Sequence, residues 1–353
     1  MDERDTLTGD ARGASAPAQE LHDKTESGIG WRSDLADAIR DPDELWRLLD
    51  LPVADLPAAR RAAKLFPLLV PRGFAALMRP GDLRDPLLMQ VLPINAETLP
   101  APGFTADPLD ESGCAPVPGL LTKYHGRALL VTTGACAVHC RYCFRRHFPY
   151  ADLPRGRGWW APALARVRAD DTLNELILSG GDPLTLPDAQ LSRIAADASA
   201  IPHLTRLRIH SRLPVVLPAR IDDAFIGWFT RTRLRPVLVM HANHAREISP
   251  AVVTAIARLR AAGVTVLNQS VLLAGINDDA AVLADLSESL FAAGVLPYYL
   301  HALDHVVGAA HFLVGDERAA GIMRDLAARL PGYLVPRLVR ERPGRPGKEP
   351  LPW

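Results

Sequence analysis

Three of the four cysteines in this sequence lie within eight consecutive positions, in the stretch CAVHCRYCFRRHF (136–148). They are Cys136, Cys140 and Cys143, while Cys114 lies more than twenty residues upstream. Thiolates bind soft metal ions and iron–sulfur clusters, so this spacing indicates a metal centre. Three thiolates are one ligand short of a closed tetrahedral site. The fourth position is therefore either filled by another side chain or left open for a ligand.

Two kinds of metal centre fit these cysteines. A structural zinc site could take His139 or His147 as its fourth ligand, but zinc sites usually combine two separated ligand pairs. The sequence has no second pair of cysteines. A [4Fe–4S] cluster held by three thiolates would leave one iron without a protein ligand and free to bind substrate. The spacing favours the cluster, with a zinc-binding module as the alternative.

The composition is that of an ordinary globular protein. Of the 353 residues 48% are hydrophobic, and 40 basic side chains balance 40 acidic ones, so no global charge favours nucleic acid or an anionic membrane. The bunched cysteines are unlike a disulfide framework and suggest a reducing compartment. The polar N-terminus does not resemble a secretory signal, and no run of about twenty apolar residues is present. We therefore expect a cytoplasmic protein without nucleic-acid or membrane partners.

Six short apolar segments, each bounded by Gly, Pro, Ser or Asn, are predicted strands. They are ALLVTT (128–133), LNELILSG (173–180), TRLRIHS (205–211), RPVLVMHA (235–242), VTVLNQS (264–270) and VLPYYLHAL (295–303). Helical patterns separate them, which predicts βαβ units and a parallel sheet. Their near-continuous apolar character indicates burial on both faces. Six units are too few for a closed eightfold barrel, so we expect an α/β fold, either a partial (β/α)6 barrel or an open doubly wound sheet.

The intervening helices have clear boundary signals. Residues 249–263 begin with Ser249 as the N-cap and Pro250 at the first helical position, and Gly263 ends the helix. An apolar stripe is expected at Val253, Ile256 and Leu259. Residues 277–294 repeat the plan, with Leu283, Leu286 and Leu290 ahead of Gly294.

Polar or glycine residues follow every predicted strand. The segments are the cysteine loop, SGGDP (179–183), HSR (210–212), HANH (241–244), NQS (268–270) and HALD (301–304). Because the carboxyl ends of parallel strands meet at one edge, these segments predict an active-site rim. Gly180 and Gly181 could simply form a turn before a helix, or they could expose backbone groups to a ligand.

The N-terminal part has a different character. Residues 1–28 are polar and rich in small residues, which predicts a disordered tail. The segment DPDELWRLLDL (41–51) begins with an Asp-Pro helix start and has Leu45, Leu48 and Leu49 at helical spacing. Prolines interrupt residues 80–118, which indicates an irregular connection.

The C-x3-C-x2-C spacing, with Tyr142 before the last cysteine and a loop after the first strand, resembles the radical S-adenosylmethionine (SAM) enzymes. In that superfamily the open iron chelates the methionine moiety, and reductive cleavage gives a 5′-deoxyadenosyl radical. Longer stretches resemble the lysine 2,3-aminomutase family, in particular the short branch that makes (R)-β-lysine for modification of elongation factor P. They are VPGLLTKYHGRALLVTTGACAVHCRYCFRRHFPY, LSGGDPL, RLRIHSRLPVVLPARI, VLNQSVLLAGIND and LPYYLHALDHVVGAAHF.

The resemblance covers residues from about 31 to the C-terminus and implies a domain plan. A radical SAM partial (β/α)6 TIM-like barrel would occupy residues 119–310, after an N-terminal helical and irregular extension at 29–118. A C-terminal segment, 311–353, would carry the lysine that forms an imine with pyridoxal 5′-phosphate (PLP). That lysine is Lys348, in RERPGRPGKEPLPW. Without the resemblance it would be taken for a surface residue of a basic tail.

The resemblance also assigns cofactor ligands. Cys136, Cys140 and Cys143 would hold a [4Fe–4S] cluster. S-adenosyl-L-methionine would contact Gly180, Gly181, Asp182, His241 and Gln269. Tyr124 and Arg127 would lie near PLP, and the guanidinium of Arg127 suits its phosphate. Larger family members have an almost all-glycine run before the lysine, whereas this chain has Gly344-Arg345-Pro346-Gly347.

The substrate residues follow from the same match. Arg145 would pair with the carboxylate of lysine, since a guanidinium fork suits a carboxylate in a dry pocket. Asp304 and Glu341 would hold the distant ammonium, because two carboxylates can neutralise a cation that is costly to bury alone. In the free-lysine enzymes both are Asp, and Glu341 is one methylene longer. Arg146 would balance charge near the cluster, and His147 and Cys114 have no assigned role.

The implied reaction is the isomerisation of L-α-lysine to β-lysine by intramolecular amino transfer. The implied partners are the small-molecule substrate L-lysine, elongation factor P or its lysyl ligase, and a reductant such as flavodoxin or ferredoxin. Two other functions remain as alternatives: an aminomutase for another amino acid such as glutamate, and a non-catalytic iron–sulfur redox or sensor protein.

Overall fold

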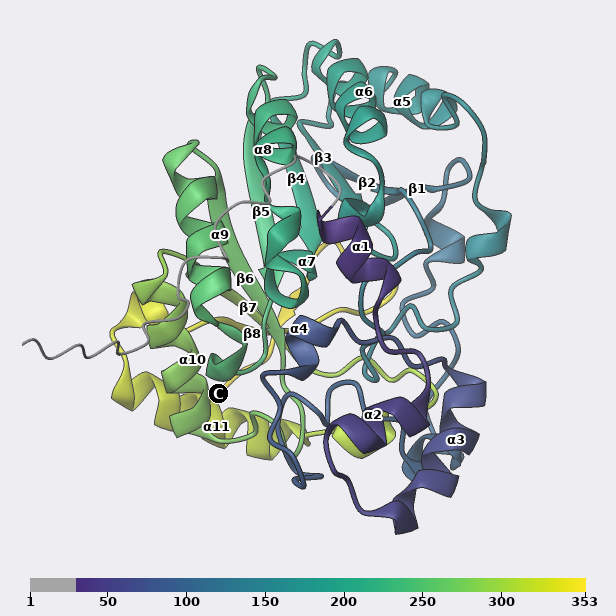
Figure 1. Ribbon diagram of the computed structural model, residues 1–353. Helices are drawn as coiled ribbons and strands as arrows, with labels where there is room; N and C mark the ends of the chain where they lie inside the picture. Colours follow the sequence, from purple (N-terminus) through teal and green to yellow (C-terminus); the bar gives the residue numbers. More distant parts are fainter. Residues whose placement is uncertain (1–29) are drawn as a thin grey trace, which may run out of the picture.

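The computed structural model describes residues 30–353 and is built around a nine-stranded sheet whose spatial order follows the chain, β1 to β9 (Figure 1). The strands are β1 (Leu120–Tyr124), β2 (Arg127–Val131), β3 (Glu175–Ser179), β4 (Arg206–Ser211), β5 (Arg235–His241), β6 (Thr265–Val271), β7 (Leu296–His301), β8 (Arg337–Arg340) and β9 (Glu349–Pro350). Neighbours from β2 to β8 are parallel, and β1 and β9 are antiparallel at the two edges. The predicted disordered tail, residues 1–28, lies outside the described residues.

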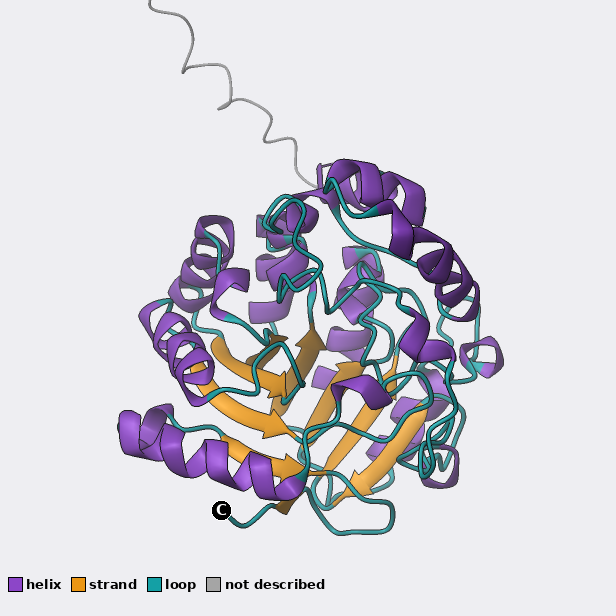
Figure 2. Ribbon diagram, turned by 90° about the horizontal axis from the view of Figure 1, so that it is seen from below, coloured by secondary structure: helices purple, strands orange, loops and turns teal. Residues whose placement is uncertain are grey.

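The sheet confirms the partial barrel and excludes the doubly wound alternative. Each strand from β2 to β7 is followed by a helix and then by its own spatial neighbour, which gives six β/α units. A doubly wound sheet would reverse its strand order at a switch point, and this order does not reverse. The two antiparallel edge strands do not pair with each other, so the barrel is open. Figure 2 shows the curved sheet with helices along its outer side.

The six predicted strands correspond to β2–β7, and three further strands were not predicted. The parallel strand β8 continues the sheet beyond residue 310, because Tyr299, Leu300 and His301 of β7 pair with it. The sequence of β8 is RLVR, in which two apolar residues stand between arginines, so it lacks a recognisable strand pattern. The extra strand brings the C-terminal segment against the barrel.

The expectation of apolar burial on both faces was wrong for β4. Leu207 and Ile209 point outward and are fully buried, whereas Arg208 and His210 line the interior. An alternating strand of this kind buries one apolar face and presents polar side chains on the other. The part of the barrel interior beside β4 is therefore a cavity with polar side chains, in contrast with the packed centre of a closed barrel.

The helices on the outer side of the sheet are α5 (Ala161–Arg168), α6 (Asp188–Ser199), α7 (Leu213–Val216), α8 (Asp223–Thr230), α9 (Pro250–Ala261), α10 (Ala280–Ala292) and α11 (Asp316–Arg329). Ser249 caps α9 as predicted, because its Oγ accepts from the backbone N–H of Val252. The predicted stripe of α9 was wrong at one position: Val253 is 41% exposed and Val252 is buried instead, while Ile256 and Leu259 are buried. The three predicted leucines of α10 are all buried.

The N-terminal elements are α1 (Gly30–Ala36), α2 (Pro42–Leu48), α3 (Leu56–Leu65) and α4 (Arg72–Ala75), followed by irregular chain. In α2, Leu45 is buried whereas Leu48 is 48% exposed. This part of the chain holds the cysteine loop by backbone hydrogen bonds, from His139 N to Leu69 O (3.0 Å) and from Arg141 N to Gln90 O (2.9 Å). The N-terminal extension therefore positions the cysteines.

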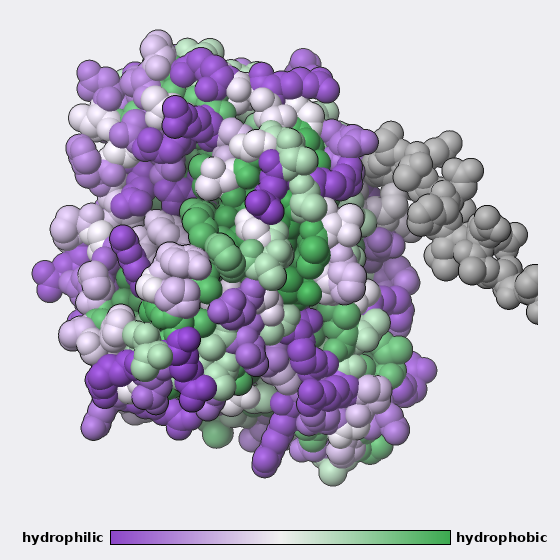
Figure 3. Space-filling model, turned by 90° about the vertical axis from the view of Figure 1, so that its left-hand side faces the viewer, coloured by the Kyte–Doolittle hydropathy of each residue, from purple (hydrophilic) through white to green (hydrophobic). Residues whose placement is uncertain are grey.

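One face of the molecule, on the side of α9 and α10, shows hydrophobic side chains among hydrophilic ones (Figure 3). Among the exposed apolar side chains are Val253 of α9 and Phe291 of α10. In the part of the chain that the structure describes, none of the helices has the length and apolar character needed to cross a membrane.

Candidate functional site

A cavity of about 250 Å³ inside the barrel brings together every site residue predicted from the sequence. Its walls include Tyr124, Arg127, Cys136, Cys140, Cys143, Arg145, Gly180, Gly181, Asp182, His241, Gln269, Asp304, Glu341 and Lys348. These residues come from both ends of the barrel sequence and from the C-terminal segment. We call this space the main cavity.

The three cysteines of the loop are free thiols, each half-buried at the wall of the main cavity. Burial, together with the neighbouring cysteines, raises the pKa of Cys136 well above its usual value and that of Cys143 to about 12. Thiols must lose their protons to bind metals, so a positively charged centre would have to stabilise the thiolates. Within residues 30–353, no three His, Cys, Asp or Glu side chains are arranged to hold one metal ion. A four-iron cluster requires no such convergence, because each cysteine binds its own iron.

The two histidines considered as a fourth metal ligand have other partners. His139 Nδ1 lies 2.9 Å from Pro67 O and its ring stacks on Phe66. His147 Nε2 lies 3.3 Å from Val307 O. Cys114 lies apart from the other cysteines, in the short 3₁₀ helix η3 (Ser112–Cys114), and does not line the main cavity.

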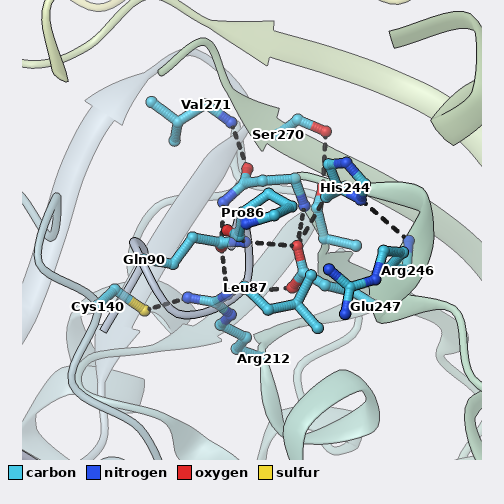
Figure 4. A network of polar contacts seen from close by, with 12 residues as sticks. Pro86, Leu87, Gln90, Cys140, Arg212, His244, Arg246, Glu247, Ser270 and Val271 are labelled. Carbon is cyan, nitrogen blue, oxygen red and sulfur yellow. Dashed lines mark hydrogen bonds and ion pairs between the residues drawn. The ribbon is translucent and has the colours of Figure 1, made fainter. Parts of the chain in front are cut away.

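A buried arginine in the predicted rim segment HSR (210–212), which had no individual role assigned, contacts the cysteine loop. Arg212, directly after β4, donates from Nη1 to the Sγ of Cys140 at 2.6 Å and to the hydroxyl of Tyr142 at 2.7 Å. Its Nη2 donates to Gln90 at 2.5 Å and to Glu247 at 3.1 Å (Figure 4). Burial alone would lower the pKa of Arg212. The neighbouring Cys140, Tyr142 and Glu247 have the larger effect and raise this pKa above its usual value. The cysteine loop therefore has a fixed positive charge beside one sulfur.

Gly180 and Gly181 lie against the backbone at the start of the cysteine loop. The Gly181 N–H donates to Thr133 O at 2.6 Å, and an added Cβ at Gly181 would lie 2.3 Å from Ala135 O. Gly180 has φ +133°, a backbone conformation that favours glycine. The Gly181 N–H already donates within the chain. The methionine amine predicted to bind here would therefore contact backbone carbonyl groups of this loop. An ammonium donates hydrogen bonds, so carbonyl oxygens suit it.

Asp182 joins the ends of β3 and β4. Its carboxylate accepts from Ser211 Oγ (2.8 Å), from Arg212 N (2.7 Å) and from Leu184 N (3.0 Å). Burial raises the pKa of Asp182 to about 6, although these hydrogen bonds oppose the shift. The carboxylate thus fixes the loop that carries Gly180 and Gly181.

His241 and Gln269, at the ends of β5 and β6, lie side by side in the cavity wall. The amide nitrogen of Gln269 lies 2.7 Å from His241 Nε2, so it donates to the neutral ring. Burial, followed by the charges of Arg212 and Arg145, lowers the pKa of His241 to about 3. A neutral ring at physiological pH adds no charge beside the cysteine loop.

A chain of five alternating charges runs along the main cavity, and all of its members except Glu111 line it. In order the side chains are Arg145, Glu111, Lys123, Glu341 and Lys348. Neighbouring groups are joined by contacts of 2.6, 2.8, 2.8 and 2.5 Å. Two of the five, Glu111 and Lys123, were not identified from the sequence. Their other partners, Arg145 and Glu341, lie 34 and 218 positions away respectively, so no local pattern marks them.

Glu341 and Asp304 differ in their charge environment. Burial alone would raise the pKa of Glu341. The charges of Lys348 and Lys123 have the larger effect and hold this pKa well below its usual value. Burial and the nearby Glu341 raise the pKa of Asp304 to about 7. No hydrogen bond from residues 30–353 reaches the Asp304 carboxylate. One carboxylate is therefore committed to cations and the other is available to a ligand.

Arg127 and Tyr124 form a cationic and aromatic pair at the start of the barrel. The guanidinium of Arg127 lies 5.0 Å from the centroid of the Tyr124 ring, and its buried Nε has no hydrogen-bond partner. No carboxylate among the described residues pairs with Arg127. An unpaired cation in a cavity wall fits an anionic group such as a phosphate. Lys348 lies in the same cavity, with its ammonium 5.9 Å from the Tyr299 ring.

Several further cavity residues had no individual role assigned from the sequence: Lys123, Ser179, Arg208, His210, Arg212, Tyr298, Tyr299 and His301. Four of these, Ser179, His210, Arg212 and His301, belong to the polar segments predicted for the active-site rim. His210 and His301 each have a buried Nε2 without a partner. Burial lowers the pKa of both far below the usual value, with the charges of Arg208 and Lys348 respectively adding to the effect. In the sequence, His210 and His301 each follow an apolar residue of a strand, and this alternation could have indicated that the two histidines face the interior.

Arg146, predicted to balance charge near the cluster, also has a structural contact. Its Nη2 pairs with Glu97 at 2.8 Å, and the side chain is almost fully buried. Glu97, in η2 (Asn95–Thr98), also accepts from Nε and Nη2 of Arg141. The two arginines therefore fasten the cysteine loop to the N-terminal extension.

Comparison with known proteins gives several relatives over nearly the whole chain, although no family model matches it. A protein of Escherichia coli K12 named L-lysine 2,3-aminomutase is 54% identical over 328 residues, which is 93% of this chain and 96% of the relative. One of the same name from Haemophilus influenzae is 48% identical over 318 residues, 90% of this chain and 94% of the relative. Another from Clostridium subterminale is 34% identical over 325 residues, 91% and 77% of the two chains. A solved radical SAM methyltransferase from Sphaerobacter thermophilus is 20% identical, with a TM-score of 0.43 over 63% of this chain and 68% of that one.

Proposed function

The chain belongs to the L-lysine 2,3-aminomutase family, and from this premise we propose that it converts L-α-lysine to β-lysine with a [4Fe–4S] cluster, SAM and PLP. The observation that carries the proposal is the single cavity that contains the three cysteines, Lys348, Arg145 and two carboxylates. A site with these groups has a place for a metal cluster, an imine-forming amine and both charged ends of lysine.

The residues of the cavity fit the three cofactors. Cys136, Cys140 and Cys143 would hold the cluster, and the loop of Gly180 and Gly181 would contact SAM beside it. Lys348 would hold PLP, with the unpaired guanidinium of Arg127 at its phosphate. When bound, these groups together supply a carbon-centred radical and a π-system that delocalises it. Everything else in the reaction depends on how the chain places the substrate.

The chain's own residues would orient lysine at its two ends. Arg145 is buried with its Nη1 directed to Ser179 Oγ (3.0 Å), so a carboxylate in the cavity meets a fixed guanidinium. Glu341, in the part of the charge chain away from Arg145, and Asp304, in the wall of the same cavity, would hold the side-chain ammonium. Glu341 already holds the ammonium of Lys348 at 2.5 Å, which is direct support for a cation subsite. The enclosing barrel would keep water from the reacting atoms.

We further propose that the product is the R isomer, made in the cytoplasm for attachment to elongation factor P, and that a flavodoxin or ferredoxin supplies electrons. The support is the resemblance to the short branch of the family. The E. coli relative matches over 96% of its length, compared with 77% for the Clostridium relative. Elongation factor P or its lysyl ligase would then receive the product.

Two other functions are less well supported by the cavity. An aminomutase for glutamate would place an anionic side chain beside Asp304 and Glu341, where like charges repel. A non-catalytic iron–sulfur protein would have no use for Lys348, Arg127 and Arg145 around one cavity.

The test is anaerobic reconstitution with iron, sulfide, PLP, SAM and dithionite, followed by chromatography of the products of L-lysine. We expect β-lysine from the wild type and none from Lys348→Ala, which should also lose the absorbance of protein-bound PLP. If no β-amino acid forms from any proteinogenic amino acid, the proposed reaction is wrong. A protein that contains four irons but gives the same PLP spectrum in Lys348→Ala would contradict the assignment of Lys348.

A further inference from the structure

Glu111 is a buried carboxylate that the proposed reaction leaves without a role. Its side chain is 3% exposed and its two oxygens accept from Nε of Arg145 (2.6 Å) and Nη2 of Arg145 (2.8 Å). The oxygen that faces Nη2 also lies 2.8 Å from Lys123 Nζ. Bidentate pairing of this kind is the arrangement that a free carboxylate would itself make with a guanidinium.

The position of Glu111 decides which edge of Arg145 remains available. The Nε and Nη2 edge is occupied, while Nη1 donates to Ser179 Oγ at 3.0 Å and, more weakly, to Gly180 O at 3.4 Å. A substrate carboxylate can therefore approach on the Nη1 side without breaking the pair. Glu111 holds the guanidinium in one orientation and directs that side to the main cavity.

Glu111 also changes the charge that a substrate meets. The side chain of Arg145 is 7% exposed, so without a partner it would be a buried cation with a strong demand for an anion. The carboxylate of Glu111 meets much of that demand before any substrate binds. When a substrate with an uncharged carboxyl derivative binds, Arg145 therefore still has Glu111 as its anionic partner.

The surroundings leave room beside the pair. A second cavity of about 250 Å³, the outer cavity, is lined by Glu111, Arg145, Phe144, Leu121 and further residues of 106–119 and 147–153. Arg145, Phe144 and Leu121 line the main cavity as well. A group attached to the carboxyl of a substrate in the main cavity therefore has the outer cavity next to it, across Arg145, Phe144 and Leu121.

We propose that Glu111 is a specificity-determining and positioning residue: it orients Arg145 and offsets its charge, so that the site accepts lysine with either a free carboxylate or an amide at that position. This inference rests on the proposed function, and it names the substrate class as lysine and lysine amides. The amide class includes a lysine already joined through its carboxyl group to a larger molecule.

The test compares L-lysine with L-lysinamide in the reconstituted holoenzyme, for the wild type and for Glu111→Gln. The glutamine keeps the shape but removes the charge, so Arg145 regains its demand for an anion. We expect the ratio of kcat/KM for lysine to that for lysinamide to rise at least about tenfold in Glu111→Gln. The ratio of the two dissociation constants, measured from the absorbance of bound PLP, should change in the same direction and by a similar factor.

Two variants complete the design. Glu111→Asp keeps the charge but shortens the side chain, so it should lower kcat for both substrates and keep the wild-type ratio. Glu288→Gln removes an exposed carboxylate on α10, which lines neither cavity, and should change neither. A purely structural role would reduce activity on both substrates equally. The proposal is overturned if the ratio in Glu111→Gln rises by less than about tenfold, stays unchanged or falls. It is also overturned if the ratio rises as much in Glu111→Asp as in Glu111→Gln. If the wild type makes no β-lysine, the proposed function fails, while the binding ratios still test Glu111.

Discussion

Substitution of Gly181 by alanine tests the closest backbone contact in the site. The new Cβ would lie 2.3 Å from Ala135 O and 2.8 Å from the carbonyl carbon of Gly134. Ordinary contacts begin about 1 Å farther out, and both neighbours are backbone atoms that cannot rotate away. The end of β3 and the start of the cysteine loop must therefore separate.

The cost follows from what that separation breaks. Overpacking of a tight site costs about 1–3 kcal/mol. The hydrogen bonds from Gly181 N to Thr133 O (2.6 Å) and from Asp182 N to Ala135 O (2.7 Å) are each worth about 0.5–1.5 kcal/mol. The loss of chain freedom in the unfolded state returns about 0.4–1 kcal/mol. We expect the free energy of unfolding to fall by about 2–4 kcal/mol.

The assay is urea denaturation of the cofactor-free protein, followed by measurement of iron after anaerobic reconstitution. Gly315→Ala is the matched control, because an added Cβ there meets nothing within 4 Å. We expect Gly181→Ala to be destabilised and to bind less iron, and Gly315→Ala to resemble the wild type. Equal stability of the two variants, with full iron content in both, would refute the steric reasoning.

Three further predictions concern buried charges. Arg212→Gln removes the donor to Cys140 Sγ (2.6 Å), so the reduction potential of the reconstituted cluster should fall. A redox titration followed by electron paramagnetic resonance measures this potential. An unchanged potential would show that the contact is unimportant. Asp304 has a pKa raised by burial to about 7, so the folded state binds its proton more tightly than the unfolded state and loses stability as pH rises from about 4 to 7. Relative to Asp304→Asn, the wild type should lose about 2 kcal/mol of unfolding free energy between pH 5 and pH 7 in urea titrations, whereas parallel curves for the two proteins would contradict this. Glu97→Gln weakens the partner of two buried arginines and should destabilise the cofactor-free protein by about 3–5 kcal/mol in the same assay, and a loss below 1 kcal/mol would argue against the network.

The sequence was most informative where a local pattern has a single physical meaning. The strands β2–β7 were predictable because each is an apolar run between turn residues, and α9 because Ser249 and Gly263 mark its ends. The strand β8 was not, because Arg337 and Arg340 flank only two apolar residues. The choice between Val252 and Val253 depends on which side of α9 meets the sheet, and helical spacing alone does not specify it.

The site shows the same division between local and distant information. The cysteines and Lys348 were located from motifs, and all predicted site residues line one cavity. Lys123 acquires meaning through Glu341, 218 positions away, and Glu111 through Arg145, 34 positions away. Arg212 likewise depends on Cys140, 72 positions earlier. Charge networks of this kind are formed by the fold, so no single segment contains them.

The central claim is that this chain moves the amino group of lysine within one molecule. The most direct measurement uses L-lysine labelled with ¹⁵N at the α-amino group, incubated anaerobically with the reconstituted protein, with the products analysed by mass spectrometry and NMR. We predict β-lysine that carries the ¹⁵N label on its β carbon, and no conversion by Lys348→Ala. Absence of β-lysine, or β-lysine in which the label has been lost to solvent ammonia, would contradict the account.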